Sequence, residues 1–360
     1  MATAASIDAG ALEVHARLGP KGLEALHLRN TRPVAVRALE GRSPADVLAR
    51  VPRLFSLCAM AQTAAARAAL DAAGCGQGDT VPTPGRIHDE LVVAAETAQE
   101  HLWRLMLDWP ALLALPAAQR TEWRTRFTAI YRRLTTMRQE GQGAPGAELS
   151  ALAHEIAAPL LDAVGGELDP ALTTAQATPL LPILGARACV EQLDFGRAFS
   201  RAPELDGAAH ETGVLARHAA DTETAARLRQ GQRIRARIAA RIADLRECGQ
   251  VLSTSPRPDR TRIDAFSPTP GTGLACVASA RGLLIHRVRV DETTSGPRVI
   301  EYSVIAPTEW NFHPRGAFVR EALAAPRGTP AALERRLRAL ALALDPCVAV
   351  SWAIEEKLHA

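Results

Sequence analysis

The stretch VIAPTEWNFHPRG, residues 304–316, joins two kinds of structure near the C-terminal end of the chain. Before it, in the segment LIHRVRV at residues 284–290, the charged Arg287 and Arg289 alternate with the apolar Val288 and Val290. The turn residues TTSG follow, and RVIEYSVI then leads into the stretch itself. This order predicts a β-hairpin. After the stretch, residues 330–344 have the pattern of a helix. That helix is expected to stop before Asp345-Pro346, because a residue that precedes proline disfavours helical backbone.

Most of the remaining chain is predicted to be helical. Apolar residues recur at helical spacing, and glycine or proline marks the ends of the segments. The predicted helices cover residues 56–73, 87–109, 117–139, 151–164, 185–200 and 222–247. Residues 11–40 are typical of short strands and turns, and residues 141–150 and 251–272 are predicted to be loops. The sequence therefore predicts an α+β protein that is mainly helical, with a small sheet near its C-terminal end.

The predicted helix 222–247 is unusually rich in arginine. The arginines are Arg227, Arg229, Arg233, Arg235, Arg237, Arg241 and Arg246. We interpret them as a face exposed to solvent, which is the usual place for such a run of charges. The alternative is a docking face for an acidic partner.

Composition narrows the classes of protein that the chain can belong to. The chain has 360 residues, of which 47% are apolar, so it can bury a large core, and we expect one domain spanning residues 1–360. The formal net charge of +3 is too small to indicate binding to nucleic acid or a membrane surface. No run of apolar residues is long enough to span a bilayer. The first residues have neither a secretory signal nor a twin-arginine motif, so we expect a cytoplasmic protein.

The six cysteines do not form a CxxC pair. They are Cys58, Cys75, Cys189, Cys248, Cys276 and Cys347. In a reducing compartment most cysteines are free thiols that pack as small apolar side chains. Composition alone therefore gives no reason to treat any of the six as a metal ligand.

Six segments together resemble, in order, the large subunit of nickel–iron hydrogenases. They are LEGRSPADVLARVPRLFSLCAMAQ (39–62), ETAQEHLWRLMLDW (96–109), ETGVLARH (211–218), SARGLLIHRVRV (279–290), VIAPTEWNFHPRG (304–316) and ALALDPCVAVSW (341–352). The last two are the most specific, because they are similar to the family's V-P-T-x-W-N-x-x-P-R-D and D-P-C-x-x-C-x-x-H motifs. The resemblance implies the large-subunit fold, in which the N-terminal region 1–75 and the C-terminal region 273–360 meet around a helical body, 87–250.

The metal ligands that the resemblance implies are only half present. The family binds its metals through two CxxC pairs, and here Cys58 and Cys347 stand at two of the four cysteine positions, with Phe55 and Val350 at the other two. Phe55 and Val350 have no donor atom, so a nickel site of four thiolates is not expected. Two histidine positions of the family are occupied by Gln62 and Ala353. The family's N-terminal catalytic glutamate has no clear match, and Glu13 is at most a remnant of it. We therefore expect a protein that is not an enzyme.

The residues that the family has around its iron are better preserved in this sequence than the cysteine ligands. The resemblance implies that Arg281, Pro307 and Thr308 lie around an iron that carries two cyanides and one carbonyl. Cyanide nitrogen is a charged acceptor, so a guanidinium and a hydroxyl are suitable donors. Arg281 could instead pair with a nearby acidic side chain.

The overall pattern is similar to the hydrogenase accessory proteins of the HupK/HoxV type. This resemblance implies a maturation role in which Cys58 and Cys347 transiently hold the iron unit for the precursor large subunit and other maturation proteins. It leaves Cys75, Cys189, Cys248 and Cys276 as structural thiols. Two alternatives remain open: a metal-free protein that binds the precursor, and a degenerate hydrogenase.

Overall fold

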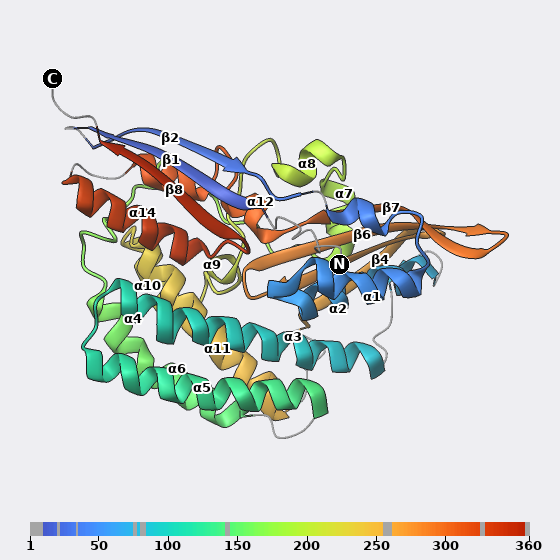
Figure 1. Ribbon diagram of the computed structural model, residues 1–360, viewed down its shortest axis with the longest axis horizontal. Coiled ribbons are helices and arrows are strands. Elements are labelled where there is room, and N and C mark those ends of the chain that lie inside the picture. The colour runs from blue at the N-terminus through green and yellow to red at the C-terminus, as the bar shows by residue number, and fades with distance from the viewer. Residues whose placement is uncertain are drawn as a thin grey trace, which may run out of the picture.

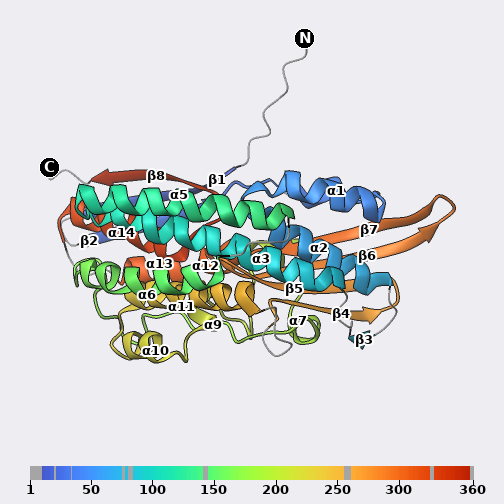
Figure 2. The same ribbon diagram turned by 90° about the horizontal axis from the view of Figure 1, so that it is seen from below.

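The computed structural model describes residues 10–19, 22–33, 35–74, 78–79, 84–140, 145–254, 261–324 and 328–356 (Figure 1). Helices form one layer, and two β-sheets lie beside it, one toward each end of the molecule's long axis (Figures 1 and 2). The functional motifs lie where the two sheets and the helical layer meet.

Four long helices form the helical layer: α3 (Pro84–Trp103), α5 (Ala117–Glu140), α6 (Gly146–Ala163) and α11 (Arg233–Thr254). Helix α11 contacts both α3 and α6, and α3 also contacts α5. Buried apolar side chains such as Leu102, Ile156 and Leu245 fill the space between them. Helix α3 continues through a π turn (Arg104–Asp108) into α4 (Trp109–Leu112). Pro110 is tolerated there because it stands in the first turn of α4, where a missing N–H costs little.

The shorter helices connect this layer to the sheets. They are α1 (Pro44–Leu54), α2 (Ala59–Gly74), α7 (Ala186–Gln192), α8 (Arg197–Arg201), α9 (Val214–Arg217), α10 (Thr222–Arg229), α12 (Pro307–Asn311), α13 (Ala317–Leu323) and α14 (Pro330–Leu344). Two short 3-10 turns, η1 (Ala35–Leu39) and η2 (Ser56–Cys58), flank α1.

The larger sheet has the strand order β3-β4-β5-β6-β7, and all of its neighbouring strands are antiparallel. Its strands are β3 (Gly78–Asp79), β4 (Ile263–Thr269), β5 (Thr272–Ser279), β6 (Gly282–Thr293) and β7 (Gly296–Ile305). The alanine-rich helix α2 lies directly on it. At Gly273 a β-carbon would come within 1.9 Å of the carbonyl oxygen of Ala69, so only glycine permits this close approach. The small side chains therefore fix where α2 begins, next to Cys58.

The smaller sheet joins the two ends of the chain. Strand β1 (Ala11–Gly19) pairs antiparallel with β2 (Gly22–Asn30) and parallel with β8 (Ala349–Glu356). Leu12, Val14, Ala16 and Leu18 alternate along β1 and are almost fully buried, which is the pattern of a strand with one covered face. The C-terminal motif is thus placed beside the N-terminal strands.

One face of α11 carries buried charges. Arg233, Arg237 and Arg241 follow one another at four-residue spacing and are at most 6% exposed. Arg237 donates to both oxygens of Glu211 at 2.8 Å and to both oxygens of Glu321 at 2.6–2.8 Å. These pairs hold the segment that precedes α9, the helix α11 and the helix α13 together.

Several of the predictions from sequence are confirmed, and others are wrong. The mainly helical body, the hairpin of β6 and β7 and the final helix α14 are confirmed. The predicted helix 222–247 is wrong, since Gly231, with φ +72°, breaks it into α10 and α11. The solvent-exposed face predicted for its arginines is also wrong for Arg233, Arg237 and Arg241, because nearby glutamate and aspartate side chains compensate their charges.

Two predicted loops contain regular structure. Helix α6 begins at Gly146, inside the predicted loop 141–150, and strand β4 lies inside the predicted loop 251–272. The strand β8 was missed, because its short run of apolar residues becomes a strand only through pairing with β1. That the chain folds as one domain stays a prediction.

No helix among the described residues is both long and apolar enough to cross a lipid bilayer. This agrees with the absence of long apolar runs in the sequence.

The buried pairs on α11 give a stability prediction. Substituting Arg237→Met should lower the free energy of unfolding by about 3–5 kcal/mol, because Glu211 and Glu321 would keep only Arg233 as a buried partner. The matched control is Arg126→Met, which removes a pair with the half-exposed Glu155 and should cost at most about 1 kcal/mol. Urea unfolding followed by circular dichroism measures both. Equal losses in the two variants would contradict the structural role of the α11 pairs.

Candidate two-cysteine site

Cys347 lies just beyond the C-terminal end of α14, where Asp345 turns the chain toward β8. Asp345 has a left-handed backbone, with φ +53°. Its buried carboxylate accepts hydrogen bonds from Arg104 at 2.8 Å and Arg241 at 2.9 Å, and it lies 3.4 Å from Nε of Arg281. Burial alone would raise the pKa of Asp345, but the three guanidinium groups outweigh it and lower that pKa. The charged carboxylate therefore anchors the backbone two residues before Cys347.

The thiol of Cys347 accepts hydrogen bonds from two side chains. Oγ1 of Thr308 lies 3.1 Å from Sγ and accepts the amide N–H of Cys347 at 3.0 Å. Nη1 of Arg32 also lies 3.1 Å from Sγ, and the same guanidinium pairs with the buried Glu309. Thr308 and Glu309 both belong to α12, whose first residue is the buried Pro307. The motif at residues 304–316 thus holds Cys347 directly.

Cys58 ends the turn η2, immediately before helix α2. The amide of Gln62, one turn along α2, donates to Sγ at 3.5 Å. The carboxylate of Glu96 on α3 accepts the backbone N–H groups of Met60 and Ala61 at 2.9 Å and so fixes the start of the helix. Burial, followed by the nearby negative charges of Cys347 and Glu96, raises the pKa of Cys58 to about 12. The thiol is therefore protonated at neutral pH.

The fold brings Cys58 and Cys347 into one electrostatic environment. Ionisation of Cys347 raises the pKa of Cys58, and both thiols act on Arg32 and Arg281. The four arginines around them are balanced by four acids: Glu309 with Arg32, Glu100 with Arg281, Asp108 with Arg104, and Asp345 with Arg241. These paired arginines therefore leave little free positive charge, and burial keeps the thiol of Cys58 neutral.

Arg281 takes part in ion pairs, as the alternative interpretation of this residue expected. Its Nη2 donates to Glu100 on α3 at 2.6 Å, and its Nε faces Asp345. It also stabilises the charged form of Cys58, so it lies beside the thiols as well as beside the acids. Gly282 after it has φ +135°, and a β-carbon there would meet Gly213 at 2.8 Å, so the motifs at 211–218 and 279–290 touch at this point.

A chain of polar side chains runs from Cys58 into the large sheet. The carbonyl oxygen of the Gln62 side chain accepts a hydrogen bond from Nε2 of His286 at 2.8 Å, and Nδ1 of His286 accepts one from the hydroxyl of Tyr302 at 2.8 Å. Burial lowers the pKa of His286 to about 3, so the ring is neutral. The position at which the family has a histidine is thus filled by an amide that holds the thiol.

The family's cysteine and histidine positions that carry no donor atom here lie on different elements. Phe55 stands at the end of α1 and is half-buried. Val350 and Ala353 lie in strand β8, opposite Leu12 and His15 of β1. Glu13 is on β1, 3.6 Å from the exposed Arg29, so it has a partner at the sheet surface and not in the site.

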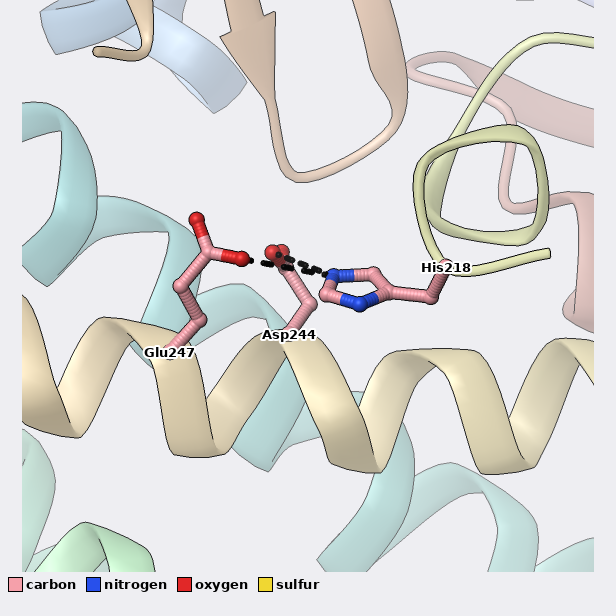
Figure 3. A group of neighbouring side chains, drawn as sticks. All are labelled: His218, Asp244 and Glu247. Carbon is pink, nitrogen blue, oxygen red and sulfur yellow. Dashed lines mark hydrogen bonds and ion pairs between the residues drawn. The ribbon is translucent and has the colours of Figure 1, made fainter. Parts of the chain in front are cut away.

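Among the described residues, one further group has the spacing of a metal site: His218, Asp244 and Glu247, whose ligand atoms lie within 4.8 Å of one another (Figure 3). Asp244, however, already pairs with Arg217 at 2.6 Å and Arg262 at 2.9 Å. Two guanidinium groups against the same carboxylate oppose a cation there. We therefore interpret this group as a buried charge network that supports α11.

Among the described residues, Cys189, Cys248 and Cys276 have hydrogen-bond partners other than Cys58 and Cys347. Cys189 on α7 and Cys276 on β5 are buried with their sulfur atoms 3.4 Å apart. Cys248 on α11 accepts a hydrogen bond from Arg262 at 3.4 Å. Cys75 lies outside the described residues. The structural role expected for these thiols stays a prediction.

Sequence reasoning missed Arg32, Glu100 and the anchoring role of Asp345. Asp345 stands inside the Asp-Pro-Cys motif, so the motif itself was the available signal. Arg32 lies in a segment without any recognised motif. Glu100 is one of several acidic residues on its helix, and nothing in the local sequence distinguishes it from the others. Only the folded chain brings Arg32 to Cys347 and Glu100 to Arg281.

The class of protein follows from comparison with solved structures. The fold is that of the large subunit of nickel–iron hydrogenases. The chain superposes on an NAD⁺-reducing [NiFe]-hydrogenase in its H₂-reduced state with a TM-score of 0.60 and 15% identity, covering 91% of this chain and 92% of that one. For the reduced Ni-Fe-Se hydrogenase from D. vulgaris Hildenborough the TM-score is 0.63 and the identity 15%. That superposition covers 91% of this chain and 94% of the hydrogenase chain. These likenesses confirm the fold class predicted from the motifs.

Similar sequences narrow the class to one family. The chain is 31% identical to the hydrogenase expression/formation protein HupK of Rhizobium leguminosarum bv. viciae, over 90% of each chain. It is also 31% identical to HoxV of Cupriavidus necator, over 90% of this chain and 91% of that one. It is likewise 31% identical to HupV of Azotobacter chroococcum mcd 1, over 95% of this chain and 97% of that one. The chain matches no protein-family model. It belongs to the HupK/HoxV family of hydrogenase expression/formation proteins.

The raised pKa of Cys58 predicts its reactivity. Only the thiolate reacts with iodoacetamide, so alkylation of Cys58 in the folded protein should accelerate roughly tenfold per pH unit between pH 8 and pH 11. In urea-unfolded protein the rate should already level off near the ordinary cysteine pKa, about 9. Timed alkylation with quantification of the Cys58 peptide by mass spectrometry gives both profiles. Identical pH profiles in the two states would contradict the proposed environment.

Proposed function

We propose that this protein is a hydrogenase maturation accessory protein in which Cys58 and Cys347 transiently hold the iron unit, with its two cyanides and one carbonyl, before transfer to the precursor of the large subunit. The observation that supports it most is the convergence of the two cysteines, from opposite ends of the chain, on Arg32, Arg281 and Thr308. The iron unit is cargo in this proposal, and the protein works in the cytoplasm with the other maturation proteins.

The donors in the site suit such a cargo. Two soft thiolates bind a late transition metal well, but they hold it less firmly than four, which favours release. Cyanide needs hydrogen-bond donors, and Thr308 can turn its hydroxyl from the sulfur of Cys347 toward the ligand once that sulfur has bound iron. Arg32 and Arg281 supply positive charge near the thiols.

Loading is coupled to proton release. The thiol of Cys58 keeps its proton in the metal-free protein, and a metal ion displaces it on binding. Arg281 stabilises the thiolate of Cys58 only in part, since burial and nearby negative charges outweigh it, and a bound metal ion supplies the remaining positive charge. The reverse step, protonation of the thiols, assists release to the precursor.

A metal-free interaction protein is the second candidate. The observation that favours it is that Arg281 already has acidic partners, Glu100 and Asp345, so it persists for a structural reason. Under this alternative the two cysteines contribute only to folding.

Infrared spectroscopy separates the two candidates. Protein purified without oxygen from a host that makes hydrogenase should show cyanide and carbonyl stretching bands. The substitutions Cys58→Ser and Cys347→Ser should abolish the bands, because a lost ligand weakens a metal site by more than the roughly 10- to 100-fold typical of its supporting residues. Cys248→Ser, which changes a buried thiol outside the site, is the matched control and should keep them.

Two results would overturn the scaffold proposal. One is persistence of the bands in the double Cys58→Ser, Cys347→Ser variant. The other is their absence from the unmodified protein while hydrogenase maturation in the host still requires it, which would leave the metal-free interaction protein.

The missing thiolates also predict that the protein does not turn over hydrogen. Phe55 and Val350 stand where the family has two of its four cysteines, so the thiolate set that nickel needs is incomplete. Purified protein incubated under hydrogen with an oxidised viologen dye should leave the dye unreduced, while a hydrogenase assayed alongside reduces it. Sustained dye reduction that disappears in the Cys347→Ser variant would contradict this expectation.

A further inference from the structure

A cavity of about 360 Å³ lies next to the two-cysteine site. It is bounded by the end of β2, the turn η1, the helix α8 and the strand β7. The volume is near the lower end of the range for small-molecule sites, about 300–1,000 Å³, so the cavity suits a compact ligand better than a peptide.

Positive charge dominates the lining of the cavity. It is lined by five arginines (Arg32, Arg37, Arg197, Arg201 and Arg287) and three glutamates (Glu40, Glu301 and Glu309). Glu309 pairs with Arg32, and Glu301 lies within 3.5 Å of both Arg287 and Arg289. Two of the three carboxylates are therefore already compensated.

Three of the arginines that line the cavity are exposed and, among the described residues, are not part of a close ion pair. Arg37, Arg197 and Arg201 are exposed, and within the described part of the chain none has a carboxylate oxygen within 4.0 Å. Each guanidinium has five N–H donors, which bind anionic acceptors strongly. Apolar side chains, among them Val36, Phe55 and Phe195, complete the wall.

Arg32 connects the cavity to Cys347. Its side chain lines the cavity, and its Nη1 donates to Sγ of Cys347 at 3.1 Å. Phe55, which stands where the family has a cysteine, lines the same space. The side chain of Arg32 thus reaches from the lining of the cavity to the thiol.

We infer that this cavity binds a compact metal–cyanide anion, and that it is where the iron unit first lodges before the thiols coordinate it. The arginines bind the cyanide nitrogens, and the apolar wall faces the carbonyl. The identity of the natural ligand rests on the proposed function. Binding of the anion itself does not require the thiols.

Hexacyanoferrate(II) is a suitable probe. Its six coordination positions are filled by cyanide, so it cannot bond to the thiols and reports on the cavity alone. Isothermal titration at low salt should detect binding to the unmodified protein. The double variant Arg197→Glu, Arg201→Glu should bind roughly tenfold or more weakly, because two guanidinium contacts become repulsive. The matched control Arg124→Glu, Arg132→Glu makes the same charge change on exposed residues of α5 and should retain binding, apart from a small general effect of net charge.

The thiol variants separate this inference from the proposed function. Cys58→Ser, Cys347→Ser should bind hexacyanoferrate(II) like the unmodified protein even though it is expected to lose the infrared bands of the iron unit. Absence of binding to the unmodified protein, or equal weakening by the α8 and α5 variants, would overturn the inference while leaving the thiol scaffold intact. Equal competition by sulfate would show a general anion site, and competition by a short polyglutamate peptide would show a peptide site. Either result would also overturn the assignment.

Discussion

The carboxylate of Asp345 contacts guanidinium groups from three separate parts of the chain, and the position of Cys347 depends on these contacts. Arg104 comes from the π turn after α3, Arg241 from α11, and Arg281 from the turn between β5 and β6. A buried carboxylate without partners would be very costly, so Asp345 favours the arrangement in which all three elements meet around it. The left-handed backbone of Asp345 then directs the chain past Cys347 into β8, which pairs with the N-terminal strand. One buried charge thus links the helical layer, the large sheet and the two chain ends.

The other buried charges follow the same rule. Along α11, Arg233 and Arg237 are paired with Glu211 and Glu321, and Asp244 accepts from arginine and histidine side chains. Such pairs contribute less to net stability than apolar contacts of the same size, because both charges lose their water. Each pair is nevertheless directional. We interpret the network as a device that sets the register of α11 against the segments bearing the motifs, so that small errors in helix placement leave an unpaired charge.

The ligand set that remains is chemically different from that of a working hydrogenase. Two thiols survive, each held by neighbouring donors: Cys58 by Gln62, and Cys347 by Thr308 and Arg32. Burial and nearby negative charges raise the pKa of Cys58, so its thiol is neutral in the free protein. In the proposed carrier, loading would release the proton of Cys58 and unloading would return it. The arginine-lined cavity beside Arg32 extends this site toward solvent.

The sequence by itself determined the family, the fold class and which ligands are missing, because these depend on short motifs whose residue types and order are specific. Asp345, Cys347 and Thr308 were all visible in such motifs. Only the tertiary structure decided what the unmarked residues do. Arg32 and Glu100 reach the site through strand and helix positions that no local pattern distinguishes, and the arginines of α11 turn inward because their acidic partners come from distant segments. Strand β8 likewise exists because β1 offers it a pairing edge. Local spacing encodes backbone preference and motif chemistry, whereas the pairing of charges and strands far apart in the chain is settled only when the whole chain folds.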